Sequence, residues 1–306
     1  MERIAELKSR EIFDIIEPTV GAFVPLLEEK RAEIQEITRK TFKYGPTDRH
    51  QLDVYYPLAP NALGKTQILV WLYGGGFVSG ERQLPAPADL AYACVGAYFA
   101  RRGFIVIIPD YRLAPDTVFP GAAEDVRDAI LWAIKNPEQL TTPTTPNPDT
   151  KGIFLSGHSA GAVHAFTALV IPETPETSIR SNIAGAILAA GVPHYDYFQP
   201  DDLTPWATQH YVDEDGLKDH APRALLRNAS DATVATLPRI VLVLAEWEPE
   251  WLLKINDEFV GELESRTGKR PAKIVGRRHN HLSTNLALGT GRGEEWAEDV
   301  IAWIKA

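Results

Sequence analysis

The chain has 306 residues, of which 44% are hydrophobic and 24% are charged, and its formal net charge is −10. This charge argues against a nucleic acid or an anionic membrane surface as a partner, because phosphate groups are bound by clustered Lys and Arg. The single cysteine, Cys94, excludes an internal disulfide bond and suits a reducing compartment. We expect one α/β domain over residues 1–306.

The first 37 residues are predicted to be helical, over 2–16 and 20–37, and to lie outside the sheet. Phe23, Val24 and Leu27 would either line a cap over a binding site or brace the core. The start of the chain is charged and amphipathic and has no apolar core of a signal peptide, so the cytoplasm is the expected location. No transmembrane run is evident in the sequence, so no membrane span is expected.

Apolar runs then alternate with helical patterns, which predicts a mostly parallel sheet with helices on both faces. A loop with three prolines at 141–148 precedes the fifth of the predicted strands. The strands are expected at 41–44, 52–55, 68–72, 104–108, 152–155, 185–189, 240–244 and 273–275, and the helices at 86–102, 122–136, 160–170, 250–266 and 294–305.

The third strand is followed by Tyr73-Gly74-Gly75-Gly76-Phe77. Consecutive glycines at a strand end let main-chain N–H groups approach a substrate oxygen, as in the oxyanion loops of lipases and esterases. We expect Gly75 and Gly76, together with the N–H of Ala160, to be the oxyanion donors. The alternative for such a run is a flexible loop.

The most informative motif is Gly157-His158-Ser159-Ala160-Gly161, which lies between a predicted strand and a predicted helix. This setting is that of a nucleophile elbow, where small residues flank the serine because the main chain turns sharply. The motif alone is common in ordinary turns. Its position makes Ser159 the expected nucleophile.

A nucleophilic serine needs a base, which in this order of motifs follows the acid along the chain. Only two of the downstream histidines, His279 and His281, also follow a late predicted strand. We prefer His281, which precedes an apolar residue and the expected helix-capping Ser283, whereas His279 follows Arg277-Arg278 and is expected to face solvent. A His-x-His metal site is disfavoured because no third ligand has suitable spacing.

The acid is expected where the strand 240–244 ends, in Ala245-Glu246-Trp247-Glu248-Pro249. Both Glu246 and Glu248 are candidates. Glu248 is preferred because the proline after it fixes its own φ and turns the chain off the strand. The alternative is a glutamate that only favours a helix N-terminus.

Further motifs carry a resemblance to a family. Asp110-Tyr111-Arg112-Leu113-Ala114-Pro115 and Phe119-Pro120-Gly121-Ala122-Ala123-Glu124-Asp125-Val126, taken with the glycine loop and the elbow, resemble the hormone-sensitive-lipase branch of the α/β-hydrolase esterases over about residues 67–171. The resemblance implies the α/β-hydrolase fold, the triad Ser159, Glu248 and His281, and no cofactor or metal. The chain departs from the family in Tyr73, where the loop usually begins with His, and in Glu248-Pro249, where Asp-Pro is usual.

The expected function is that of a serine carboxylesterase, which cleaves small-molecule esters of small or medium acyl groups through an acyl-enzyme intermediate. The aromatic-rich insertion 191–237 and the segment 1–37 would form a small helical cap, with the insertion lining a pocket or packing on itself. The alternatives are a formamidase of the N-formylkynurenine type, a lactonase, and a ligand-binding protein on a hydrolase scaffold. The sequence predicts neither the physiological ester nor the oligomeric state.

Overall fold

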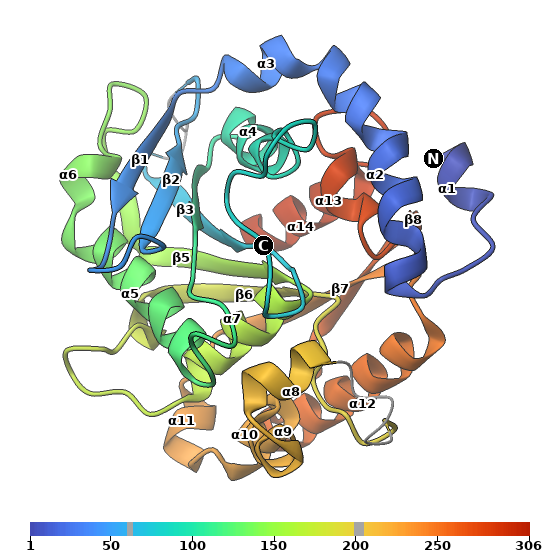
Figure 1. Ribbon diagram of the computed structural model, residues 1–306. Helices are drawn as coiled ribbons and strands as arrows, with labels where there is room; N and C mark the ends of the chain where they lie inside the picture. The colour runs from blue at the N-terminus through green and yellow to red at the C-terminus, as the bar shows by residue number, and fades with distance from the viewer. Residues whose placement is uncertain (60–63, 199–204) are drawn as a thin grey trace.

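The computed structural model describes residues 1–59, 64–198 and 205–306. In these ranges eight strands form one sheet in the order β1-β2-β4-β3-β5-β6-β7-β8 (Figure 1). Strands β3 to β8 run parallel to one another, whereas β2 is antiparallel to both β1 and β4. The expected α/β fold is thus confirmed. The strands are β1 Arg39–Lys43, β2 Gln51–Tyr55, β3 Thr66–Leu72, β4 Ile105–Pro109, β5 Pro148–His158, β6 Ile183–Ala189, β7 Arg239–Trp247 and β8 Ala272–Asn280.

The central strands are continuous apolar runs because helices cover both faces of the sheet. Every residue of β4 is buried, whereas β1, which pairs only with β2, is mostly exposed at the edge. Helices α4 and α14 cover one face and contact each other through Tyr98 and Glu298, and α5, α7 and α12 cover the other (Figure 1). Phe166 of α7 packs on Phe259 of α12 with ring centroids 5.1 Å apart.

The helices of the described ranges mostly follow the strands that they cover. They are α1 Glu2–Ala5, α2 Ile12–Glu29, α3 Arg31–Gln35, α4 Ala93–Arg101, α5 Gly121–Lys135, α6 Pro137–Leu140, α7 Ala160–Val170, α8 Pro205–Tyr211, α9 Glu214–His220, α10 Pro222–Asn228, α11 Asp231–Ala235, α12 Glu250–Thr267, α13 Ser283–Ala287 and α14 Glu295–Lys305, with a 3₁₀ turn at Arg180–Asn182.

The N-terminal segment is helical, but its helices begin and end at other residues than predicted. Helix α2 runs through Pro18 and Pro25, although an interior proline costs about 3 kcal/mol. Its buried face, which includes Phe23 and Leu27, belongs to the main hydrophobic core. Packing of this face offsets the missing main-chain hydrogen bonds, so these two residues brace the core.

Helix α4 begins later than predicted, at Ala93, and Pro87 stands in the expected first turn. Cys94 is fully buried in this helix, as expected. Helices α8 to α11 follow β6, and α10 contacts both α7 and α12 (Figure 1). Within the described ranges, no helix combines the length and apolar character that crossing a membrane requires.

Candidate active site

Ser159 stands directly after β5 and before the first residue of α7. Its φ of 54° and ψ of −123° lie in a region that side-chain-bearing residues rarely adopt and that costs on the order of 1–3 kcal/mol. The Ser159 N–H donates to the carbonyl oxygen of Ala189, at 2.8 Å, which ties the turn to the end of β6. The turn leaves the side chain of Ser159 partly exposed at the carboxyl edge of the sheet.

The glycine after the elbow is required by a close approach of α7 to β3. A Cβ on Gly161 would lie 2.4 Å from the carbonyl oxygens of both Leu72 and Tyr73. Real contacts of a Cβ with an oxygen are much longer, so any side chain here would push the helix off the sheet. The motif therefore holds α7, and Ser159 with it, close to the end of β3.

The glycine loop after β3 folds back on itself beside Ser159. Gly75 has a φ of 138°, and a Cβ there would lie 2.0 Å from the carbonyl oxygen of Ser79. Within the described residues, the N–H groups of Gly75, Gly76 and Ala160 donate to no acceptor. These are the three N–H groups that the sequence predicts as oxyanion donors, and in the described chain each of them is available to bind a substrate oxygen.

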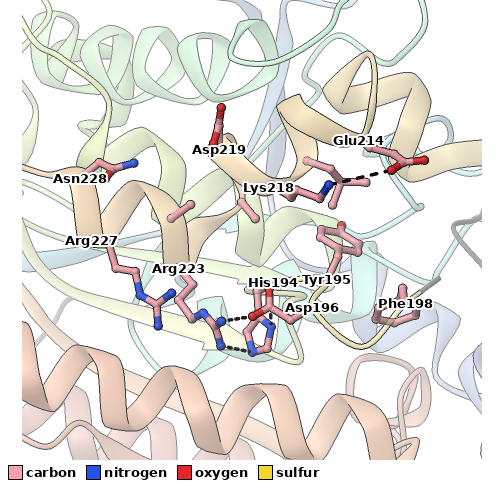
Figure 2. A pocket seen from close by; sticks show the side chains of 13 residues that line it. His194, Tyr195, Asp196, Phe198, Glu214, Lys218, Asp219, Arg223, Arg227 and Asn228 are labelled. Atoms are coloured by element: carbon pink, nitrogen blue, oxygen red, sulfur yellow. Dashed lines mark hydrogen bonds and ion pairs between the residues drawn. The ribbon is translucent and has the colours of Figure 1, made fainter. Parts of the chain in front are cut away.

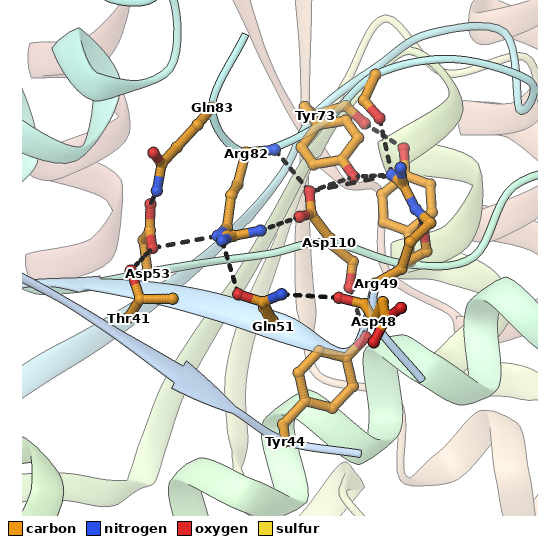
Figure 3. Close-up of polar contacts among 12 residues, drawn as sticks. Thr41, Tyr44, Asp48, Arg49, Gln51, Asp53, Tyr73, Arg82, Gln83 and Asp110 are labelled. Atoms are coloured by element: carbon orange, nitrogen blue, oxygen red, sulfur yellow. Dashed lines mark hydrogen bonds and ion pairs between the residues drawn. The ribbon is translucent and has the colours of Figure 1, made fainter. Parts of the chain in front are cut away.

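A partly buried polar network holds the ends of the glycine loop (Figure 3). The Tyr73 hydroxyl donates to Asp110 at 2.8 Å and accepts from Arg49 at 2.9 Å. Arg49 also donates to the Gly80 carbonyl oxygen at 2.8 Å, at the far end of the loop. Burial raises the pKa of Tyr73 well above its usual range, so the hydroxyl keeps its proton.

Asp110 is the centre of this network, which we call the loop clamp and define as Arg49, Tyr73, Arg82 and Asp110. Its carboxylate accepts the main-chain N–H of Arg82 at 2.6 Å and forms an ion pair with the Arg82 guanidinium. Tyr111 adds a hydrogen bond of 2.7 Å from its hydroxyl to the Tyr73 carbonyl oxygen. The clamp was not predicted from the sequence, although Tyr73 departs from the histidine that is usual in the family.

The ends of β7 and β8 bring Glu248 and His281 together. Trp247 pairs with Asn280 across the two strands, so the next residues along each chain lie side by side. His281 Nδ1 donates to Glu248 Oε2 at 2.8 Å, and both side chains are almost completely buried, with 2% and 1% of their surface exposed. Glu248 Oε1 accepts the N–H of Ala245 at 3.3 Å.

The two alternative residues have other partners. Glu246 is exposed and accepts the N–H of Arg278 at 2.6 Å. His279 does not face solvent, as had been expected, but is buried, with Nδ1 2.9 Å from Ser283 Oγ and Nε2 2.6 Å from the Gly293 carbonyl oxygen. Burial lowers the pKa of His279.

Asn280, which carries no functional signal in the sequence, holds the turn that contains His281. Its side-chain oxygen accepts the N–H groups of Leu282 and Ser283 at the start of α13, at 3.2 and 3.0 Å. The expectation that Ser283 caps this helix is therefore wrong: Ser283 is the first helical residue. Asn280 Nδ2 donates in turn to Thr19 Oγ1 of α2, at 2.8 Å.

Residues 278–282, which carry the expected base His281 and which we call the base loop, lie beside the elbow. The rings of His158 and His281 have centroids 4.7 Å apart. In the described part of the chain, neither Ser159 Oγ nor His281 Nε2 takes part in a hydrogen bond within 3.5 Å. Such bonds are often long in a protein without substrate and tighten in the complex.

Aromatic side chains from the insertion cover the glycine loop. Trp206 Cγ would lie 3.5 Å from a Cβ on Gly76, and Phe77 stacks on His210 with ring centroids 4.4 Å apart. Burial lowers the pKa of His210 to about 4. Among the described residues, Trp206 Nε1 and the Tyr211 hydroxyl are buried without a hydrogen-bond partner.

A cavity of about 550 Å³ lies between the segment after β6 and helices α9 and α10 (Figure 2). His194 accepts from Arg223 there, at 3.0 Å, and Arg223 pairs with Glu258 at 3.1 Å. None of the described lining residues is Ser159, Glu248 or His281, so this cavity is separate from the strand ends. The lining residues are His194, Tyr195, Asp196, Phe198, Glu214, Leu217, Lys218, Asp219, Ala221, Arg223, Ala224, Arg227 and Asn228.

The sheet order, the strained turn at Ser159 and the carboxylate–imidazole pair beyond β7 and β8 together have the arrangement of an α/β hydrolase. A model of the family described as alpha/beta hydrolase fold matches residues 69–269, so the chain belongs to this family. The resemblance found in the sequence is confirmed.

Curated relatives are similar to the chain at low identity. It is 31% identical over 204 residues to the non-reducing polyketide synthase ausA of Aspergillus calidoustus, a match to 62% of the chain and 8% of that protein. It is 24% identical to a probable isoprenylcysteine alpha-carbonyl methylesterase of Oryza sativa, over 86% of the chain and 63% of that protein. It is 25% identical to the kynurenine formamidase of Salmo salar, over 83% of the chain and 78% of that protein. The chain thus spans only part of the first two relatives.

Among solved structures, the chain is similar to an esterase of Pyrobaculum calidifontis, with a TM-score of 0.69 and 21% identity over 99% of the chain and 96% of that protein. At this identity the likeness supports the fold.

Proposed function

We propose that this protein is a carboxylic ester hydrolase in which Ser159 is the nucleophile, His281 the general base and Glu248 the residue that orients the base. The observation that carries the proposal is the buried Glu248–His281 pair beside the strained turn at Ser159. Next to this turn, the N–H groups of Gly75, Gly76 and Ala160 have no acceptor within the described residues. The methylesterase among the relatives supports the ester as the substrate class.

In the proposed reaction, His281 Nε2 takes the proton from Ser159 Oγ as this oxygen attacks the ester carbonyl carbon. Nδ1 of the same ring keeps its proton, which forms a hydrogen bond to Glu248, and the carboxylate stabilises the imidazolium that forms. The imidazolium returns the proton to the leaving alcohol, which leaves an acyl group on Ser159. Water, deprotonated by His281, then attacks the acyl carbon. The bond from this carbon to Ser159 Oγ breaks, the imidazolium returns the proton to Ser159 Oγ, and the acid is released. These steps need no metal or cofactor.

The negative charge of each tetrahedral intermediate would be bound by the N–H groups of Gly75, Gly76 and Ala160. Their lack of acceptors in the described chain supports this role, because a donor already in use would have to be released during the reaction. The loop clamp fixes both ends of the glycine loop, so these donors are positioned before the substrate binds.

We further propose a single domain in which the described residues of the insertion 191–237 cap the site, with the N-terminal segment bracing the core beside the base loop. Residues 199–204 of this insertion lie outside the described ranges. Aromatic side chains over Gly76 suit a small or medium acyl group, and the free donors of Trp206 and Tyr211 favour one with a polar substituent. The cytoplasmic location stays a prediction.

Formamide hydrolysis is the second candidate, because the kynurenine formamidase matches most of the chain. The same nucleophile, base and oxyanion donors would attack a formamide carbonyl and expel an amine.

The test is hydrolysis of p-nitrophenyl acetate, butyrate and octanoate and of N-formylkynurenine by the wild type and by Ser159→Ala. We expect turnover of a short ester that Ser159→Ala loses almost completely. Preferential turnover of the formamide would favour the second candidate. Unchanged ester turnover by Ser159→Ala would refute the role of this serine.

A further inference from the structure

His158 lies between three parts of the proposed machinery. It directly precedes Ser159, and its Nδ1 would lie 3.2 Å from a Cβ on Gly74, so its ring packs under the glycine loop. On its other side, Nε2 lies 2.7 Å from the main-chain carbonyl oxygen of His281. The side chain is buried, with 3% of its surface exposed.

The partner of Nε2 fixes the proton on the His158 ring. A carbonyl oxygen only accepts hydrogen bonds, so Nε2 must carry the hydrogen and donate it. Burial, together with the nearby His281, lowers the pKa of His158 to about 3. The ring therefore stays neutral at ordinary pH and keeps the Nε2–H form, which leaves Nδ1 without a hydrogen.

We propose that His158 is a positioning residue: its Nε2–H holds the main chain of His281 and so places the base against the elbow and the glycine loop. This role rests on the proposed function of Ser159 and His281. It differs from the role of Glu248, which holds the His281 side chain, because His158 holds the main chain of the same residue.

The need for this bond follows from the shape of the base loop. His281 follows a strand with a register shift between β7 and β8, and Arg278 there has a φ of 62°. Regular sheet pairing therefore does not fix the main chain at His281. Three described side chains bond the main chain of residues 280–283. Asn280 accepts the N–H groups of Leu282 and Ser283, and Ser283 Oγ accepts the N–H of Asn280 at 2.9 Å. Among these three, His158 is the one that bonds the main chain of His281 itself, through its carbonyl oxygen. A misplacement of about 1 Å at a catalytic group can cost about 100-fold in rate.

Glutamine and asparagine at position 158 separate this role from simple filling of space. The amide nitrogen of glutamine lies about as far from Cα as Nε2 of histidine, whereas that of asparagine corresponds to Nδ1. Only His158→Gln can therefore reach the His281 carbonyl. His158→Met fills similar space and has no donor, so it replaces the asparagine variant if that chain does not fold.

We expect His158→Asn and His158→Met to lower kcat for p-nitrophenyl butyrate about 10- to 100-fold with KM changed less than about threefold. His158→Gln should retain kcat within about threefold of the wild type. Thermal melts of each variant establish that the folded protein is compared. Loss of kcat in all three variants alike, or in none, would overturn the role.

NMR of protein labelled with ¹⁵N-histidine tests the bond without any turnover. We expect the His158 ring in the Nε2–H form between about pH 5 and 8, with a proton that exchanges slowly with water. An Nδ1–H ring, or a second proton gained in this range, would refute the inference. Absence of esterase activity in the wild type would instead refute the proposed function, and the NMR result would still decide whether His158 holds the base loop.

Discussion

Replacing Glu248 by glutamine removes the charge of the buried pair and keeps its shape. The carboxylate lies 2.8 Å from His281 Nδ1, and its side chain is 1% exposed. Solvent therefore screens the pair little. The amide oxygen of glutamine can still accept from Nδ1, so the variant tests the charge of Glu248 separately from its hydrogen bond.

The size of the effect follows from the charge that forms on His281 in the transition state. Two unit charges with centres about 4 Å apart attract by about 4 kcal/mol at an effective dielectric constant of 20. Each 1.36 kcal/mol of transition-state energy is a tenfold change in rate. We therefore expect Glu248→Gln to lower kcat by about 1,000-fold. KM should change little, because this carboxylate is buried and bonded to His281 Nδ1.

The assay is hydrolysis of a short p-nitrophenyl ester at saturating concentration, with Glu246→Gln as the matched control. Glu246 lies two residues earlier and is exposed, and its one recorded hydrogen bond is to the N–H of Arg278. Its replacement should change kcat less than about twofold. A large loss in Glu246→Gln, or more than a tenth of the wild-type rate in Glu248→Gln, would refute this account of the acid.

Three predictions concern stability, each measured by urea unfolding. Gly161→Val should destabilise the fold by at least about 3 kcal/mol, because a Cβ there would lie 2.4 Å from two carbonyl oxygens. The control Gly261→Ala, on the open side of α12, should raise the free energy of unfolding by about 0.5–1 kcal/mol. Equal effects of the two changes would contradict the close approach of α7 to β3. Asp110→Asn should cost about 3 kcal/mol because it breaks the buried pair of the loop clamp; a loss below about 1 kcal/mol would contradict it. Burial lowers the pKa of His158 from 6.5 to about 3 and that of His210 from 6.5 to about 4, so below pH 6.5 the unfolded chain binds more protons than the folded one. The free energy of unfolding should therefore fall between pH 6.5 and pH 4, by up to about 1.4 kcal/mol per pH unit for each histidine. A free energy of unfolding that does not change over this range would contradict the burial of the two rings.

The positions of Ser159 and the glycines could be predicted because their signals are local. Each motif stands directly at the end of an apolar run, and parallel strands bring their carboxyl ends to one edge of the sheet. Spacing along the chain was enough to place Gly75, Gly76 and Ser159 near one another.

The choice within each pair of acids and bases could not be settled in this way. Residues two apart lie on the same face of a regular strand, so Glu246 and Glu248, like His279 and His281, look equivalent in sequence. The register shift between β7 and β8 separates them, and it passes through Arg278, which has a positive φ without being glycine. No residue type there signals a bulge.

The loop clamp could not be predicted because its members are distant along the chain. Arg49 reaches Tyr73 across 24 residues and the carbonyl of Tyr111 across 62. A single sequence carries no signal for such pairs, and charged residues before a strand are most often solvated. The substitution of tyrosine for the usual histidine at position 73 was the one visible sign.

The hydrogen bond between Asn280 and Thr19 joins residues 261 positions apart. During synthesis on the ribosome, α2 is made well before its partner, because 261 positions separate the two residues. Closing so long a loop is entropically costly and belongs to the late steps of folding. The elbow and most of the strands are therefore synthesised before the loop that carries His281, so the proposed base reaches its place beside Ser159 only after the nucleophile is positioned.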